Sequence, residues 1–222
     1  MNQSGNRNIW MDRRHCIALA LALGISGPWG MACAQNRTGP VLVLGDSLSA
    51  EYGLNRGKGW VKLLEQRLQT EKTPRAVVNA SISGDTTSGG RARLPALLSQ
   101  HQPSIVILEL GGNDALRGLA LQSSQSNLDA MIKASQDAGA QVLLVGMQVP
   151  PNYGASYTEQ FAQMFQSTAS RHKLSLLPFL LAGFGDAPDA MQWFQADRIH
   201  PNAQAQPLML NNVWPRLQPL LK

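Results

Sequence analysis

The most informative part of this chain reads Val41-Leu42-Val43-Leu44-Gly45-Asp46-Ser47-Leu48-Ser49. Its first four residues are apolar, two of them are β-branched, and the run ends at a glycine, which is typical of a short strand buried in a parallel sheet. Open α/β folds place their sites just beyond the carboxyl ends of such strands. A serine in this position is either a nucleophile or, as is more common, part of a turn or a helix cap. The remaining sequence has to separate these two interpretations.

Apolar runs alternate with segments of helical periodicity through the rest of the chain. We expect strands at residues 41–45, 76–80, 104–110, 141–146 and 174–178. We expect helices at about residues 59–70, 90–100, 123–138, 155–172 and 202–221. This alternation predicts an α/β fold, because right-handed crossovers between parallel strands place helices on both faces of the sheet. The predicted architecture is a three-layer α/β/α sandwich around a parallel five-stranded sheet.

Glycine and proline residues mark several boundaries of these elements. Gly139 is expected to cap the helix at 123–138, since glycine is favoured just after a helix. Pro201 is expected in the first turn of the last helix. Residues 150–154, which contain two consecutive prolines, are expected to form a loop.

The first 34 residues are expected to form a secretory signal peptide, and residues 35–222 a single domain. Arginines precede an apolar run at residues 16–34, which ends in Ala32-Cys33-Ala34, a pattern of small residues that leader peptidases cleave. Glycine and proline interrupt the run, so it is a poor candidate for a membrane-spanning helix. We therefore expect a periplasmic or secreted bacterial protein without a stable membrane span after cleavage.

Three alternatives stay open for this leader. Translation can start at Met11 rather than at the first residue, which gives a leader of more usual length. The pair Arg13-Arg14 can belong to a twin-arginine export signal. Cys33 can carry a lipid, although lipoprotein signals usually have leucine where Gly30 stands.

Both cysteines, Cys16 and Cys33, lie in the predicted leader. The mature protein would therefore have no disulfide and no cysteine-based metal site. Its basic residues exceed its acidic residues only slightly and are scattered, without the aromatic-interleaved stripe that nucleic-acid binding favours. We expect no metal, no cofactor and no nucleic-acid partner. We expect a monomer whose binding partner is a small-molecule substrate.

Polar residues follow the predicted strands at the points where the strands end. Ser47 follows the first strand, Gly84 lies in the loop after the second, and Asn113 follows the third. Loops after parallel strands meet at one edge of the sheet. Asp197 and His200, just before the last predicted helix, are expected at the same edge.

Serine-based acyl transfer needs a hydroxyl, an imidazole base, a carboxylate that orients the imidazole, and donors for the oxyanion. Ser47, His200 and Asp197 can supply the first three, because a turn can fold Asp197 back onto His200. The amide of Asn113 and the backbone N–H groups of Gly84 and Ser47 can supply the donors. The sequence therefore predicts a serine hydrolase site.

Four sequence blocks occur in the order and spacing of one enzyme family. They are Gly45-Asp46-Ser47-Leu48-Ser49, Gly84, Gly111-Gly112-Asn113-Asp114 and Asp197-Arg198-Ile199-His200. With them, the chain resembles the SGNH (GDSL) hydrolase family over essentially everything after residue 39, in particular its bacterial thioesterase, lysophospholipase and arylesterase members. The resemblance implies a flavodoxin-like sheet, Ser47 as nucleophile with Asp197 and His200, and an oxyanion hole at Ser47, Gly84 and Asn113.

The acyl group is expected to lie beside two loops. Residues 114–122 are rich in leucine and long enough to act as a gate, with Leu116 as a candidate contact. In the resembled enzymes, this loop and a loop after the fourth strand line the acyl site, which implies Val149, Pro150 and Tyr153 as substrate-binding residues. Ordinary loop packing is the alternative interpretation.

Three acidic residues have other expected roles. Asp46 and Asp114 are expected to tie down loop backbone by Asx-type hydrogen bonds. Glu109 interrupts the third apolar run, so its carboxyl group must be paired or protonated. Arg93 and Arg117 are its candidate partners.

The predicted function is hydrolysis of acyl esters and thioesters by a serine esterase, through an acyl-enzyme. Lysophospholipids, fatty acyl-CoA and short aryl esters are the expected substrates. One alternative keeps this chemistry but acts on sugars, as an O-acetyl esterase or an acyltransferase. The other is a flavodoxin-like flavin-binding module, although Asp46 places a negative charge where such a module would bind a phosphate.

Overall fold

The computed structural model describes residues 38–72 and 74–222. The predicted leader, with Met11 and Cys33, lies outside these residues, so the expectations for cleavage, export and lipidation stay predictions. Within the described part of the chain, no helix is long and apolar enough to cross a membrane.

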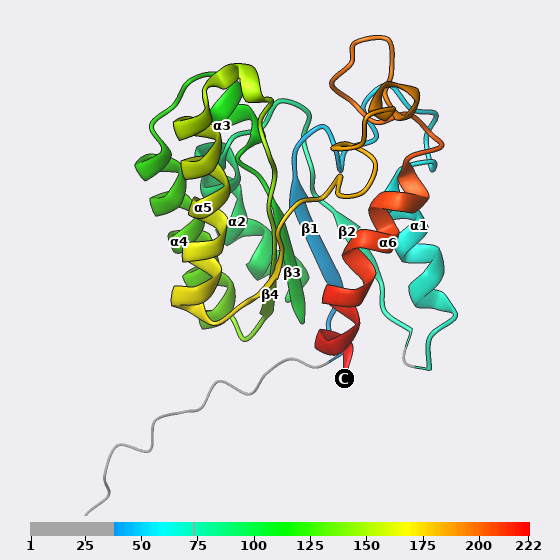
Figure 1. Cartoon of the computed structure of the whole chain (residues 1–222). Helices are drawn as coiled ribbons and strands as arrows, with labels where there is room; N and C mark the ends of the chain where they lie inside the picture. Colours follow the sequence, from blue (N-terminus) through cyan, green and yellow to red (C-terminus); the bar gives the residue numbers. More distant parts are fainter. Residues whose placement is uncertain (1–37, 73) are drawn as a thin grey trace, which may run out of the picture. The chain divides into compact units, whose positions relative to one another are not determined.

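Strands and helices alternate along the described chain, as predicted (Figure 1). The strands are β1 (Val41–Gly45), β2 (Val77–Asn79), β3 (Ile105–Glu109), β4 (Gln141–Val145) and β5 (Ser175–Leu177). The helices are α1 (Trp60–Gln69), α2 (Thr87–His101), α3 (Gly112–Leu116), α4 (Leu121–Asp137), α5 (Ala155–His172) and α6 (Gln206–Leu217). The 3₁₀ segments are η1 (Pro151–Tyr153), η2 (Ala190–Trp193) and η3 (Gln218–Leu221).

All strand pairs in the sheet are parallel, and the strands lie in the order β2-β1-β3-β4-β5. β1 therefore lies between β2 and β3: Val41 pairs with Val77 on one side and with Ile105 on the other. This is the flavodoxin-like order, in which the direction of winding changes between β1 and β3. The predicted fold class is confirmed, and the carboxyl end of β1 lies where such sheets bind ligands.

The central strands β1, β3 and β4 are buried on both faces and form the middle layer. In β1, Val41 and Val43 pack with the core on the side of α1 and α6, whereas Leu42 and Leu44 pack with the core on the side of α2, α4 and α5. All four side chains are fully buried, which explains why this run is apolar throughout instead of alternating. Figure 1 shows the two groups of helices on opposite faces of the sheet.

Gly139 ends α4 in the way its position predicts. It follows the helix with a φ of 83°. Its N–H donates to the Gln136 carbonyl, and the N–H of Ala140 donates to the Ser135 carbonyl. These two hydrogen bonds satisfy carbonyls that the end of a helix leaves without partners.

The prediction for Pro201 is wrong. The last helix begins at Gln206, with Pro207 in its first turn. Pro201 instead pairs with Phe194 in an antiparallel bridge. The bridge closes the loop of residues 195–200, so this proline shapes a loop and does not open a helix.

Two predicted loops contain helical turns. Residues 150–154 include the 3₁₀ segment η1. The segment 114–122 is interrupted, because α3 extends to Leu116 and α4 begins at Leu121. Its irregular part is limited to residues 117–120, which makes the predicted gate shorter than expected.

Candidate active site

Ser47 and His200 come together at the carboxyl end of β1, although 153 residues separate them in the sequence. Ser47 Oγ and His200 Nε2 are 2.9 Å apart. On the other side of the ring, His200 Nδ1 lies 2.6 Å from Asp197 Oδ2. The three side chains form one continuous hydrogen-bonded line, in the order that proton transfer from a serine hydroxyl requires.

A tight turn places Asp197 against His200 despite their short separation. Asp197 Oδ1 accepts the N–H groups of Ile199 at 2.9 Å and His200 at 3.0 Å, while Arg198 between them has a φ of 59°. Burial pushes the pKa of Asp197 upward, but these hydrogen bonds and the imidazole outweigh it and lower this pKa to about 2. The predicted turn is therefore present, and Asp197 stays ionised under almost all conditions.

The His200 ring also contacts Tyr52, a residue that sequence analysis missed. The two ring centroids are 4.3 Å apart, with an interplanar angle of 37°. Gln195 joins the two segments, since its Nε2 donates to the Tyr52 carbonyl and its N–H donates to the His200 carbonyl, both at 2.8 Å. The only signal in the sequence is that Tyr52 lies five residues after Ser47, in the same loop.

The three predicted oxyanion donors follow β1, β2 and β3, which are neighbours in the sheet. Gly84 has a φ of 79°, in the left-handed region that favours glycine. No group of the described chain accepts the N–H of Ser47 or of Gly84. Asn113, in α3, donates one Nδ2 hydrogen bond to Asp46 Oδ2 at 3.0 Å. Since an amide nitrogen carries two hydrogens, its second N–H is left for a ligand.

Comparison with known proteins identifies the family of this chain. Residues 43–207 match the GDSL-like Lipase/Acylhydrolase family. This chain belongs to that family. It is 52% identical over 206 residues to Esterase TesA of Pseudomonas aeruginosa, which covers 93% of this chain and 96% of that protein. It is 44% identical over 181 residues to Thioesterase 1/protease 1/lysophospholipase L1 of Escherichia coli K12, which covers 82% of this chain and 84% of that protein.

A solved structure of another esterase agrees with the family assignment. The psychrotrophic esterase EstA from Pseudoalteromonas sp., in a form inhibited by monoethylphosphonate, is 39% identical with a TM-score of 0.76, over 82% of this chain and 98% of that one. The predicted family and the predicted class of enzyme, a carboxylic ester hydrolase, are confirmed. The flavin-binding alternative has no support from these relatives.

In this GDSL-like hydrolase, Glu109 has partners other than those predicted. Its Oε2 atom accepts hydrogen bonds from Ser49 Oγ at 2.7 Å and from the Asp46 N–H at 3.3 Å. Arg93 and Arg117 instead donate to groups in the loop after β2. The predicted arginine pairing is wrong, because a hydroxyl and a backbone N–H satisfy this carboxyl group.

Asp46 and Asp114 differ in what they hold. Asp46 Oδ1 accepts the Leu48 N–H at 3.0 Å, which is the Asx-type hydrogen bond that was predicted. Asp114 instead accepts the Thr87 N–H and the Ser124 hydroxyl, both at 2.9 Å. It therefore joins α3 to α2 and α4, and the Asx-type hydrogen bond predicted for Asp114 is wrong.

The carboxyl groups of Asp46 and Glu109 bind protons unusually tightly. Burial raises the pKa of Asp46 to about 6, against hydrogen bonds from Leu48 and Asn113 that lower it. Burial and the neighbouring Asp46 charge raise the pKa of Glu109 well above its usual range. Two adjacent buried carboxylates repel each other, so ionising one disfavours ionising the other.

The residues predicted to line the acyl site lie in different environments. Leu116 and Tyr153 are exposed, as is Leu119 in the short segment between α3 and α4. Pro150 is also exposed. Val149 is 6% exposed and belongs to the core beneath α5. An acyl chain that reaches this side of the molecule can touch the exposed residues, whereas Val149 is buried.

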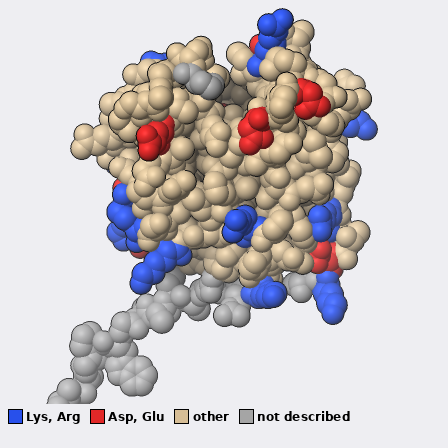
Figure 2. Space-filling view, in the orientation of Figure 1, with Lys and Arg blue, Asp and Glu red and all other residues tan. Residues whose placement is uncertain are grey.

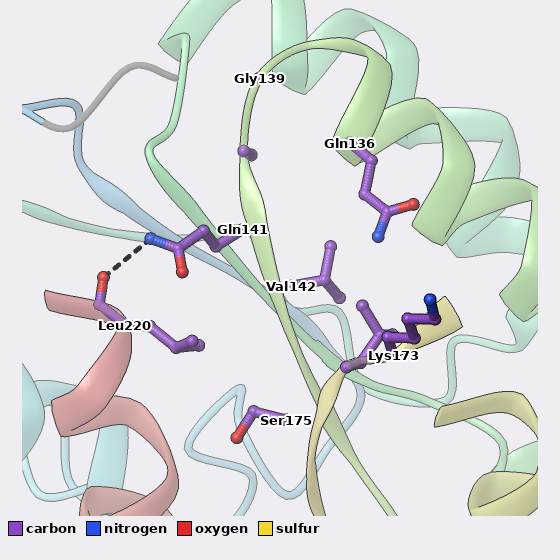
Figure 3. Close-up of a pocket in the computed structure, with 9 residues that line it drawn as sticks. Gln136, Gly139, Gln141, Val142, Lys173, Ser175 and Leu220 are labelled. Carbon is purple, nitrogen blue, oxygen red and sulfur yellow. Dashed lines mark hydrogen bonds between the residues drawn. The ribbon is translucent and has the colours of Figure 1, made fainter. Parts of the chain in front are cut away.

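Figure 2 shows the molecule hollowed at the edge where β1 ends. A second hollow, of about 400 Å³, lies near the amino ends of β4 and β5 (Figure 3). One of its walls is held by a hydrogen bond of 3.1 Å from Gln141 Nε2 to the Leu220 carbonyl. This second hollow is at the opposite edge of the sheet from Ser47, so it takes no part in the candidate active site.

Among the described residues, no group of three or more His, Cys, Asp or Glu is arranged to hold a metal.

Proposed function

We propose that this protein is a serine esterase that hydrolyses acyl esters and thioesters through an acyl-enzyme. The observation that carries the proposal is the hydrogen-bonded line from Ser47 through His200 to Asp197. In acyl transfer, a carboxylate orients the imidazole, and the imidazole takes the proton of the attacking hydroxyl. Membership of the acylhydrolase family supports the same reaction class.

In the proposed reaction, Ser47 Oγ attacks the acyl carbonyl carbon while His200 Nε2 takes its proton. Asp197, ionised because its pKa is lowered to about 2, keeps the Nδ1 proton on the imidazole and stabilises the imidazolium. His200 then gives the proton to the leaving alcohol or thiol. In the second half, His200 deprotonates a water molecule, which attacks the acyl carbon; the bond to Ser47 Oγ then breaks, His200 returns the proton to Oγ, and the acid is released.

The negative oxygen of each tetrahedral intermediate would accept hydrogen bonds from the backbone N–H groups of Ser47 and Gly84 and from the Asn113 amide. Support comes from the two backbone donors, which have no acceptor in the described chain, and from the second amide hydrogen of Asn113. A donor of this kind typically contributes ~10²–10³ in rate.

The proposed substrates are lysophospholipids, fatty acyl thioesters and short aryl esters. One relative is named a thioesterase and lysophospholipase, and another is named an esterase. The exposed Leu116, Leu119 and Tyr153 offer apolar contacts for an acyl chain. Comparing hydrolysis of a long-chain lysophosphatidylcholine with that of an acetylated sugar tests this class. Faster deacetylation of the sugar would favour the O-acetyl esterase alternative.

We further propose that residues 1–34 form a cleaved signal peptide, which exports residues 35–222 to the periplasm or out of the cell. The arginines, the apolar run and the Ala32-Cys33-Ala34 pattern support this proposal. Mass spectrometry of the mature protein from the native host would identify its first residue. An intact amino terminus, or a lipid on Cys33, would contradict it.

Ser47→Ala tests the proposed nucleophile. We expect hydrolysis of p-nitrophenyl butyrate to fall by several orders of magnitude, because no other group supplies the attacking oxygen. A fluorophosphonate should label Ser47 in the native enzyme and leave the variant unlabelled. The control is Ser126→Ala, an exposed serine of α4 whose hydroxyl bonds only the helix backbone. An S47A enzyme with more than a tenth of native activity would contradict the proposal.

A further inference from the structure

Asp46 directly contacts Asn113, one of the three predicted oxyanion donors. Its side chain is 3% exposed, and both of its oxygens accept hydrogen bonds: Oδ1 from the Leu48 N–H and Oδ2 from Asn113 Nδ2, each at 3.0 Å. The first hydrogen bond holds the loop that follows β1. The second is not needed for that loop, since it reaches 67 residues along the chain to α3.

The orientation of the Asn113 amide matters for the proposed reaction. An asparagine side chain has a donor end and an acceptor end, and rotation by half a turn exchanges them. If the carbonyl end faced the developing oxyanion, it would repel that negative charge. Above its pKa of about 6, Asp46 is a carboxylate, which accepts hydrogen bonds and cannot donate one, so it selects the orientation in which Asn113 Nδ2 faces it.

Asp46 is itself held from below by β3. Glu109 Oε2 accepts the Asp46 N–H at 3.3 Å and the Ser49 hydroxyl at 2.7 Å. The Ser49 carbonyl in turn accepts Asn79 Nδ2 at 2.8 Å. Residues 46–49 are thereby tied to both neighbouring strands, β2 and β3. This limits how far the Asp46 carboxylate can move.

We propose that Asp46 is a positioning residue for ester hydrolysis: it fixes the Asn113 amide so that the second N–H points at the oxyanion, and Glu109 and Ser49 keep Asp46 in place. This inference rests on the proposed function, because it concerns the stabilisation of the tetrahedral intermediate. Asp46 itself does not touch the substrate, and its effect passes through Asn113.

A double-mutant cycle with Asp46→Asn and Asn113→Ala tests this inference on p-nitrophenyl butyrate. In D46N, an N–H group can face Asn113 Nδ2, so we expect kcat to fall ~10- to 100-fold with KM changed by less than about twofold. N113A should lower kcat by ~10²–10³. The double variant should have the kcat of N113A, because the group through which Asp46 acts is already missing.

Two outcomes would overturn the inference: D46N keeps native kcat, or it lowers kcat by the same factor with and without Asn113. Asp129→Asn is the matched control. It converts a carboxylate to an amide in an ion pair between α4 and α5, and should leave kcat unchanged. Should D46N fail to fold in thermal unfolding, Asp46→Ala removes the acceptor without adding a donor, and the same cycle applies.

The same experiments separate this inference from the proposed function. If the proposed function is wrong, Ser47→Ala remains active and the fluorophosphonate labels another residue. If only the role of Asp46 is wrong, S47A is inactive while D46N hydrolyses the ester at the native rate. The kcat of D46N relative to that of S47A therefore tells which of the two has failed.

Discussion

Raising the pH from 4 to 8 is expected to cost the folded protein about 2–3 kcal/mol of unfolding free energy at Asp46 alone. The cause is the environment of this carboxyl group, which is 3% exposed and lies beside Glu109. Burial, the largest cause, raises its pKa from 3.8 to about 6. The folded state therefore binds the Asp46 proton more tightly than the unfolded chain does.

The sign and size follow from this difference. Below pH 3.8 the carboxyl group is protonated in both states, so its contribution to stability is fully present, and it is lost as the pH rises through 6. At about 1.4 kcal/mol per pKa unit, the complete loss is about 3 kcal/mol, most of it between pH 4 and 8. Glu109, whose pKa is also raised, acts in the same direction. Asp197, with a pKa lowered to about 2, contributes stability that is lost only below this range.

Urea unfolding followed by tryptophan fluorescence, at several pH values between 4 and 8, measures the effect. Asp46→Asn cannot ionise at this position, so the difference in unfolding free energy between native enzyme and variant should shift by about 2–3 kcal/mol across the range. D46N also removes the Asp46 charge that raises the pKa of Glu109, so the altered titration of Glu109 adds to this shift in the same direction. Parallel pH curves for the two proteins would refute the reasoning.

Two further predictions concern the loops at the carboxyl edge. Asp197→Asn should lower kcat by ~10²–10³, less than for a fully buried triad carboxylate, because Asp197 is about one-third exposed; an ester hydrolysis rate within tenfold of the native enzyme would contradict this. Gly111→Ala should cost ~1–3 kcal/mol in urea unfolding, since Gly111 has a φ of 123° and its Cβ would lie 3.2 Å from Phe165 Cζ. Gly118→Ala, where no described atom lies within 4 Å of the new Cβ, is the control, and an equal loss there would count against steric crowding at Gly111.

The three central strands β1, β3 and β4 were predictable because they are buried on both faces. β1, β3 and β4 lie within one residue of their predicted bounds or inside them, since continuous apolar runs end where the chain leaves the core. The segment between β5 and α6 was not predictable in this way. As a sequence pattern, Pro201 suits the first turn of a helix. Its pairing with Phe194 depends on a contact between two segments that the local sequence does not encode. Pro207 takes the place that Pro201 was expected to fill.

In the candidate site, the requirements of acyl transfer predicted the reacting residues but not the residues that hold them in place. Ser47, Asp197 and His200 could be selected because acyl transfer needs those three groups, and they do lie in hydrogen-bonding order. An arginine is the expected partner of Glu109, since an opposite charge commonly pairs with a buried carboxylate. The real partners are the Ser49 hydroxyl and a backbone N–H, which only the packing of β1 against β3 brings within reach.

The adjacent residues Asp46 and Ser47 link two parts of the site that are usually considered separately. Ser47 contacts His200, while Asp46 contacts Asn113. The peptide between Asp46 and Ser47 also carries the N–H proposed as an oxyanion donor. A displacement of this one peptide would therefore disturb the nucleophile and two of the oxyanion donors together. Glu109 holds this loop in place, because its Oε2 accepts a hydrogen bond from the Asp46 N–H. Burying a carboxyl group costs free energy, and fixing this peptide explains why Glu109 is buried here.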